Sequence, residues 1–171
     1  MNTATAVRSE DHAAYSPTTP TTTNLTDADR FAIDLACRAI DKLFERGGAM
    51  SDPTAAGAYF KLKLAVEPRE AFAVMYLDAR HHLINFRCEF YGTIDGAEVH
   101  PREIVRQALI CNAAAVIVGH NHPSGNPEPS AADRAVTTRL KQALSLVDVR
   151  LLDHFVVGEG SPVSLAARGW V

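Results

Sequence analysis

The feature that most constrains the fold of this chain is a pair of apolar runs that have no polar face. Residues 71–77 are apolar on both alternation faces, which is typical of a strand covered on both sides. Residues 115–118 form a second, β-branched run that indicates another buried strand. Because such strands need helices against both faces, the sequence predicts an α/β fold.

The second run leads directly into His120 and His122, which are candidate metal ligands. Side chains at positions i and i+2 of a strand point to the same side, so both imidazoles can reach one ion. Asp133 follows eleven residues after His122, past a loop rich in Pro and Gly, at the start of a predicted helix. Two neutral imidazoles and a carboxylate leave the fourth position of a tetrahedral site free for water, as in catalytic zinc sites. This pattern predicts a metal-dependent hydrolase.

Ser130 and Asp133 also have the spacing of a helix capping box. In that interpretation Ser130 is the N-cap of the helix predicted at residues 131–146. The capping and metal-binding interpretations are compatible, because the first turn of a helix can hold a metal ligand rigidly.

Composition divides the chain into three segments. Residues 1–24 are rich in Thr, Ala, Pro and Ser, and we expect a disordered tail there. Residues 25–48 are expected to form an N-terminal helix, and residues 49–171 a single domain. Within that domain we predict helices at 53–64, 101–112 and 131–146, and strands at 71–77, 82–91, 115–118, 149–157 and 163–166. The expected architecture is a mixed central β-sheet flanked by helices, with the metal site at the end of a central strand.

Charge, hydropathy and cysteine usage limit the kinds of partner. The formal net charge is −3 and no cluster of Lys and Arg stands out, so the electrostatic footprint of tight DNA binding is missing. No apolar run approaches membrane-spanning length, and the first residues lack the hydrophobic core of a signal peptide. Cys37, Cys88 and Cys111 are widely spaced and are predicted to be free, buried thiols. We therefore expect a cytoplasmic protein without membrane association.

Other zinc chemistries do not fit the sequence. A metallo-β-lactamase site needs an Asp-His pair where Ser124-Gly125 stands. Zinc deaminases need H-x-E together with P-C-x-x-C, and the chain has neither. An amidohydrolase barrel would need about 250 residues, and this chain has 171.

The stretch Gly119-His-Asn-His-Pro-Ser-Gly125, followed by Pro129-Ser130 and Asp133, resembles the signature of the JAB/MPN metallopeptidases. It is similar to the RadC-like branch of bacterial proteins in particular, and the resemblance covers roughly residues 50–171. Supporting matches are Glu70-Ala-Phe72, Leu77-Asp78, Gly92-Thr93, Pro101-Arg102-Glu103, Asn112-Ala-Ala-Ala115 and Asp153-His154.

The resemblance implies that His120, His122 and Asp133 bind Zn²⁺, and that a glutamate at the start of an early strand activates the zinc-bound water. Spacing alone leaves several glutamates open, and the family pattern selects Glu70. Ser130 would donate a hydrogen bond to the developing oxyanion. His154 could orient a metal ligand from behind or be an ordinary core histidine. The glutamates that spacing leaves open are Glu67, Glu70, Glu89, Glu98 and Glu103.

These residues lead us to expect a zinc-dependent peptidase or isopeptidase that acts on a peptide or protein, bound as an added strand at an exposed sheet edge. The alternative is a DNA-repair or mobile-element accessory protein that binds DNA or a partner, with a mainly structural metal. Full-length members carry a helix-hairpin-helix module, but only one clear helix is predicted before residue 50. DNA association through that module is therefore not carried over. A third possibility is a hydrolase fold retained as an interaction module. The sequence does not determine the oligomeric state.

Overall fold

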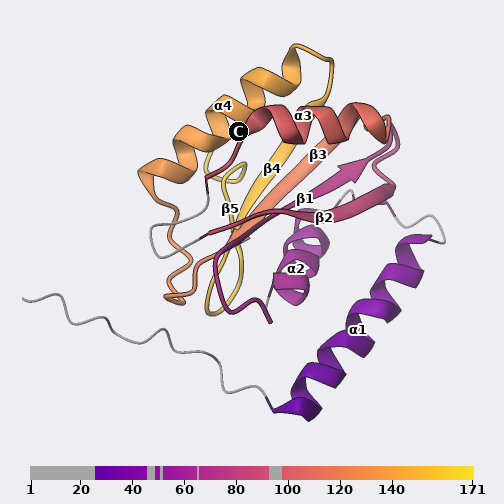
Figure 1. Ribbon diagram of the computed structural model, residues 1–171, viewed down its shortest axis with the longest axis vertical. Helices are drawn as coiled ribbons and strands as arrows, with labels where there is room; N and C mark the ends of the chain where they lie inside the picture. Colours follow the sequence, from indigo (N-terminus) through magenta and orange to yellow (C-terminus); the bar gives the residue numbers. More distant parts are fainter. Residues whose placement is uncertain (1–25, 46–48, 51, 65, 93–97) are drawn as a thin grey trace, which may run out of the picture.

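The computed structural model describes residues 26–45, 49–50, 52–64, 66–92 and 98–171, which build an α/β architecture around one sheet (Figure 1). The helices are α1 (Asp27–Glu45), α2 (Pro53–Leu64), α3 (Pro101–Ile110) and α4 (Ala131–Ser145). The strands are β1 (Ala71–Leu77), β2 (Leu83–Tyr91), β3 (Ala115–Asn121), β4 (Arg150–Val157) and β5 (Val163–Ser164). The disordered tail predicted at residues 1–24 lies outside the described residues.

The sheet has the strand order β2-β1-β3-β4-β5 and is mixed. β1 runs antiparallel to both β2 and β3, whereas β3 and β4 run parallel. Every residue of β1 and of β3 is buried. The predicted fold class is therefore confirmed, and so is the prediction that both faces of these strands are covered.

Helices cover the two faces of the sheet, α2 on one side and α3 with α4 on the other (Figure 1). The side chains of β1 alternate between the two cores. Ala73 and Met75 pack in the core beneath α2, and Val74 and Tyr76 pack in the core beneath α3 and α4. Because the side-chain period of a strand is two, this alternation fixes which residues at the end of each strand face α4.

The connection from β3 through α4 to β4 explains where a site can form. β3 and β4 are parallel neighbours, so the chain must cross from the end of one strand to the start of the next, and α4 makes that crossing. The first turn of α4 consequently lies close to the carboxyl end of β3. Ligands of open α/β sheets bind at this end of the strands.

Helix α1 lies against α2 and apart from the sheet (Figure 1). Asp41 joins the two helices, because it accepts a hydrogen bond from Tyr59 at 2.7 Å and forms an ion pair with Lys63 at 2.7 Å. Phe31 and Leu35 of α1 are 70% and 58% exposed. No helix in the described part of the chain has the length and apolar composition needed to cross a membrane.

Four sequence predictions need correction. The strand predicted to end at residue 118 continues to Asn121, so His120 lies within it. The last strand ends at Ser164, because the chain turns after it: the carbonyl of the buried Leu165 accepts from the amides of Arg168 and Trp170. The helix predicted to end at residue 112 ends at Ile110, and Asn112 follows with a φ of 54°. The predicted burial of the cysteines was wrong, since the three free thiols are only partly buried.

Gly119 allows β3 to approach α2 closely enough to pack on Phe60. A Cβ at this position would lie 2.6 Å from Cδ1 of Phe60, whose ring is fully buried. We predict that Gly119→Ala lowers the free energy of unfolding by about 1–3 kcal/mol, because the ring has no free space to move into. Urea denaturation measures the loss.

The same substitution in a Phe60→Leu background serves as the control. Leucine is smaller than phenylalanine, so Gly119→Ala should cost clearly less there, and the two substitutions should be non-additive. Equal costs in both backgrounds would show that the contact with Phe60 is not what excludes a side chain.

Candidate metal centre

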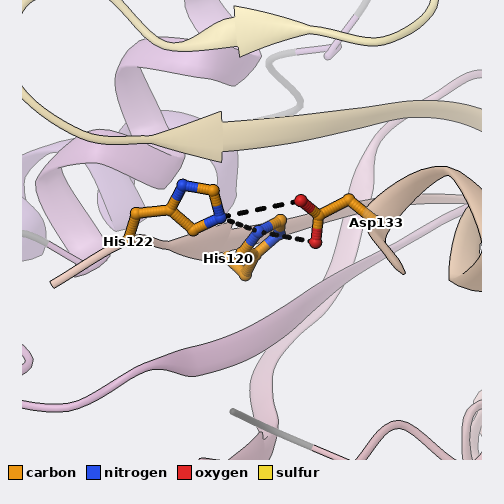
Figure 2. Close-up of side chains that lie close together, drawn as sticks. All are labelled: His120, His122 and Asp133. Atoms are coloured by element: carbon orange, nitrogen blue, oxygen red, sulfur yellow. Dashed lines mark hydrogen bonds and ion pairs between the residues drawn. The ribbon is translucent and has the colours of Figure 1, made fainter. Parts of the chain in front are cut away.

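Three predicted ligands come together at the carboxyl end of β3. His120 and His122 project from the end of this strand, and Asp133 reaches them from the first turn of α4 (Figure 2). Within the described residues, these three form the one group of His, Cys, Asp or Glu side chains whose ligand atoms converge as a metal site requires. His120 is fully buried, and His122 and Asp133 are partly buried.

The spacing of the ligand atoms fits a single ion. The Nε2 atoms of His120 and His122 are 2.9 Å apart. Nε2 of His120 lies 3.2 Å from Oδ1 of Asp133, and Nε2 of His122 lies 3.7 Å from Oδ2. Ligands of a tetrahedral zinc at bond lengths of about 2.0–2.1 Å are separated by roughly 3.3 Å, in the middle of this range. The group could therefore hold a metal ion with little rearrangement.

The tautomer of His122 suits metal binding. Its Nδ1 lies 2.7 Å from the carbonyl oxygen of Asn126, which can only accept a hydrogen bond. Nδ1 therefore keeps its hydrogen, and Nε2 is the nitrogen that offers a lone pair when the ring is neutral. A backbone carbonyl behind the ring is a common way to fix the orientation of a metal-binding histidine.

The electrostatics of the group favour positive charge at its centre. The Asp133 carboxylate raises the pKa of His122, against the opposing effect of burial. Burial disfavours the ionised form of Asp133, but His120 and His122 outweigh it and hold the pKa of this carboxyl far below its usual value. A metal cation between the rings and the carboxylate satisfies the same attraction, and it would displace the protons that otherwise occupy the site.

Ser130 and Asp133 form the predicted capping box. The Asp133 amide donates to the Ser130 hydroxyl at 3.2 Å, and the Ser130 amide donates to the Asp133 carboxylate at 2.6 Å. The Ser130 hydroxyl also donates to this carboxylate, again at 2.6 Å. The cap therefore holds the ligand in place, while the oxyanion role of Ser130 stays a prediction.

Glu70 comes to the same end of the sheet through strand register. β1 and β3 pair as far as Phe72 opposite His120, and Glu70 directly precedes the first residue of β1 at this end of the sheet. The Gly92 amide donates to the Glu70 carbonyl at 2.8 Å and fixes its backbone. After Asp133, the Glu70 carboxylate is among the groups that raise the pKa of His122. Its catalytic role stays a prediction.

His154 on β4 contacts His120, on the side of the ring away from the other two predicted ligands. It is fully buried, and its Nε2 lies 2.9 Å from Nδ1 of His120. Burial is the main reason that the pKa of His154 is well below its usual value, so this ring is neutral. His154 is therefore a core residue that also contacts a predicted ligand, and its role in orienting that ligand stays a prediction.

Two residues of the site were missed by the sequence analysis. Asn121 accepts a hydrogen bond from the Ala71 amide at 2.8 Å and donates one to the Arg69 carbonyl at 3.1 Å. Its side chain therefore binds the backbone on both sides of Glu70. Thr137 contacts His154. The signal for Thr137 was its position four residues after Asp133, on the same face of the helix.

Comparison with known proteins agrees with this geometry. The model of the family described as the RadC-like JAB domain matches residues 50–170. A "UPF0758 protein" of Xanthomonas campestris pv. campestris (strain 8004) is 64% identical over 140 residues, which are 82% of this chain and 62% of the relative. Similar proteins of Xanthomonas oryzae pv. oryzae (strain PXO99A) and Xylella fastidiosa (strain 9a5c) are 63% and 59% identical over the same shares. The chain thus spans 62% of the length of these relatives.

We predict that Asn121→Ala loosens the segment that carries Glu70 without moving the metal ligands. The substitution leaves the buried Ala71 amide without its acceptor, which should lower the free energy of unfolding by about 1–3 kcal/mol. Amide hydrogen exchange at Ala71 should become faster. Asn85→Ala, on the edge strand β2, is the control, and equal protection of Ala71 in both variants would contradict the role of Asn121.

Proposed function

The chain belongs to the RadC-like JAB domain family, and we propose that it is a zinc-dependent metallopeptidase or isopeptidase that hydrolyses an amide bond. The observation that carries the proposal is the convergence of His120, His122 and Asp133, with Glu70 directly before the strand that pairs with β3. Three protein ligands and a nearby carboxylate that can act as a base are what metal-assisted hydrolysis requires.

His120, His122 and Asp133 would hold the metal. Imidazole nitrogens favour zinc over magnesium or calcium, which prefer oxygen ligands. When bound, zinc supplies a Lewis acid that lowers the pKa of a coordinated water to about 7 and polarises the scissile carbonyl. The position of the site at the end of a fully buried strand keeps its ligands rigid.

Glu70 is assigned the proton transfers. In this assignment its carboxylate takes a proton from the attacking water as a general base, and later gives it to the leaving amine as a general acid. The backbone around Glu70 is held in place, which supports the role. The Ala71 amide donates to the Asn121 side chain of β3, and the Gly92 amide donates to the Glu70 carbonyl.

Ser130 is assigned the stabilisation of the oxyanion. Its hydroxyl hydrogen points to the Asp133 carboxylate, so it must rotate toward the substrate when the carboxylate binds metal. Its amide hydrogen bond to Asp133 would remain and keep the cap intact. Losing one such donor typically lowers the rate on the order of 10²-fold or more.

An extended peptide is the substrate class that the sheet favours. β2 is an edge strand, and it ends beside Glu70, since Tyr91 pairs with Ala71. A peptide added along β2 would gain backbone hydrogen bonds and run toward the metal centre. The net charge of −3 gives no support for DNA as the partner. Free cysteines favour a reducing compartment, and we propose the cytoplasm.

A DNA- or partner-binding accessory protein with a structural metal is the alternative. Structural zinc sites are usually closed by four protein ligands, whereas the group found in the described residues offers three. This difference favours the hydrolase.

We predict that Glu70→Gln abolishes hydrolysis and leaves metal binding intact, because the amide cannot accept the proton. Zinc-loaded wild type and variant would be incubated with a mixed-sequence peptide pool and with lysine-linked isopeptides, and cleavage followed by mass spectrometry. Glu67→Gln makes the same chemical change three residues earlier and should cleave like wild type. Undiminished cleavage by Glu70→Gln would refute the role of Glu70, and no cleavage by zinc-loaded wild type would count against the peptidase.

A further inference from the structure

A line of three buried side chains leads from α4 to the metal centre. Oγ1 of Thr137 lies 2.6 Å from Nδ1 of His154, and Nε2 of His154 lies 2.9 Å from Nδ1 of His120. All three side chains are buried, with Thr137 and His154 completely inaccessible. Each contact is therefore a hydrogen bond whose donor must be supplied by the protein itself.

The hydroxyl hydrogen of Thr137 is donated to a backbone carbonyl. Oγ1 also lies 2.6 Å from the carbonyl oxygen of Asp133, one helical turn earlier. A carbonyl oxygen can only accept, and a hydroxyl has one hydrogen, so that hydrogen goes to Asp133. In the contact with His154, Thr137 is then the acceptor, and Nδ1 of His154 carries the hydrogen.

The tautomer of His154 in turn determines the tautomer of the predicted metal ligand His120. With its hydrogen on Nδ1, a neutral His154 has its lone pair on Nε2 and accepts from Nδ1 of His120. The lone pair of a neutral His120 is then on Nε2. That atom lies 2.9 Å from Nε2 of His122 and 3.2 Å from the Asp133 carboxylate, at the centre of the proposed site.

We propose that Thr137 is a positioning residue of the metal centre, which fixes the tautomers of His154 and His120 and so aims the metal-binding nitrogen of His120. The proposal rests on the metal site of the proposed function, but not on the reaction. Metal-binding histidines commonly donate their second nitrogen to a carboxylate, carbonyl or water. Here the acceptor is another histidine, which can be donor or acceptor, so a further residue must set its direction.

Packing around the line limits its alternatives. Phe72 stacks parallel to the His120 ring at 6.1 Å between centroids, and its ring is T-shaped to that of His154, with the centroids 5.4 Å apart. Packing therefore fixes the positions of the His120 and His154 rings. It does not determine which nitrogen of each ring carries the hydrogen. Because Thr137 bonds to the backbone of Asp133, the same hydroxyl is linked to Asp133 directly and to His120 through His154.

Thr137→Val tests the proposal, because valine keeps the shape and removes the hydroxyl. We expect zinc affinity, measured by competition with a chromophoric chelator, to fall about 10–100-fold. Thr138→Val is the matched control, since Thr138 makes the same backbone bond to Arg134 but is exposed. Thr137→Ser keeps the hydroxyl and should bind zinc like wild type. Equal zinc affinity of Thr137→Val and Thr138→Val would overturn the proposal.

The imidazole nitrogen shifts of ¹⁵N-histidine-labelled wild type give a second test that does not depend on a variant folding. His154 should have its hydrogen on Nδ1, and an Nε2–H tautomer would overturn the proposal. This measurement also separates the two claims. Failure of wild type to bind zinc would count against the proposed function, while the tautomer of His154 in the same sample would still decide the role of Thr137.

Discussion

The antiparallel register between β1 and β3 is the constraint on which the whole site depends. With Phe72 opposite His120, the odd and even residues of both strands are assigned to the two cores, and His120 faces α4. A slip of one residue would turn the ligands toward α2 and away from Asp133. The register is strongly specified, because both faces of both strands are buried and either slip would exchange the two apolar sets.

The buried strand β3 and the capped start of α4 hold the three predicted ligands in fixed positions. β3 is buried along its whole length, and Gly119 lets Phe60 pack directly on it. The strand consequently presents its two histidines from a fixed position, and the capping box fixes Asp133 on the other side. Convergence of three electron-rich groups is unfavourable by itself, so the folded chain holds them ready for a cation.

Local sequence patterns predicted what depends on local geometry. The alternation of side chains in a strand placed His120 and His122 together, and the capping spacing placed Ser130 and Asp133 at a helix start. Glu70 followed only from the resemblance, because its position depends on pairing between segments fifty residues apart. Asn121 was missed for the same reason. The last strand was predicted too long, because Leu165 is apolar and fits the pattern of a strand residue. It lies in a turn, from which its side chain fills the core.

The most direct test of the central claim is the metal content of the purified chain, measured by elemental analysis for wild type and for His122→Ala side by side. Both proteins would be prepared without chelator, supplied with zinc and desalted. We expect one zinc ion per chain in wild type and almost none in the variant, because two ligands bind zinc far more weakly than three. No zinc in wild type, or the same amount in both, would contradict the claim.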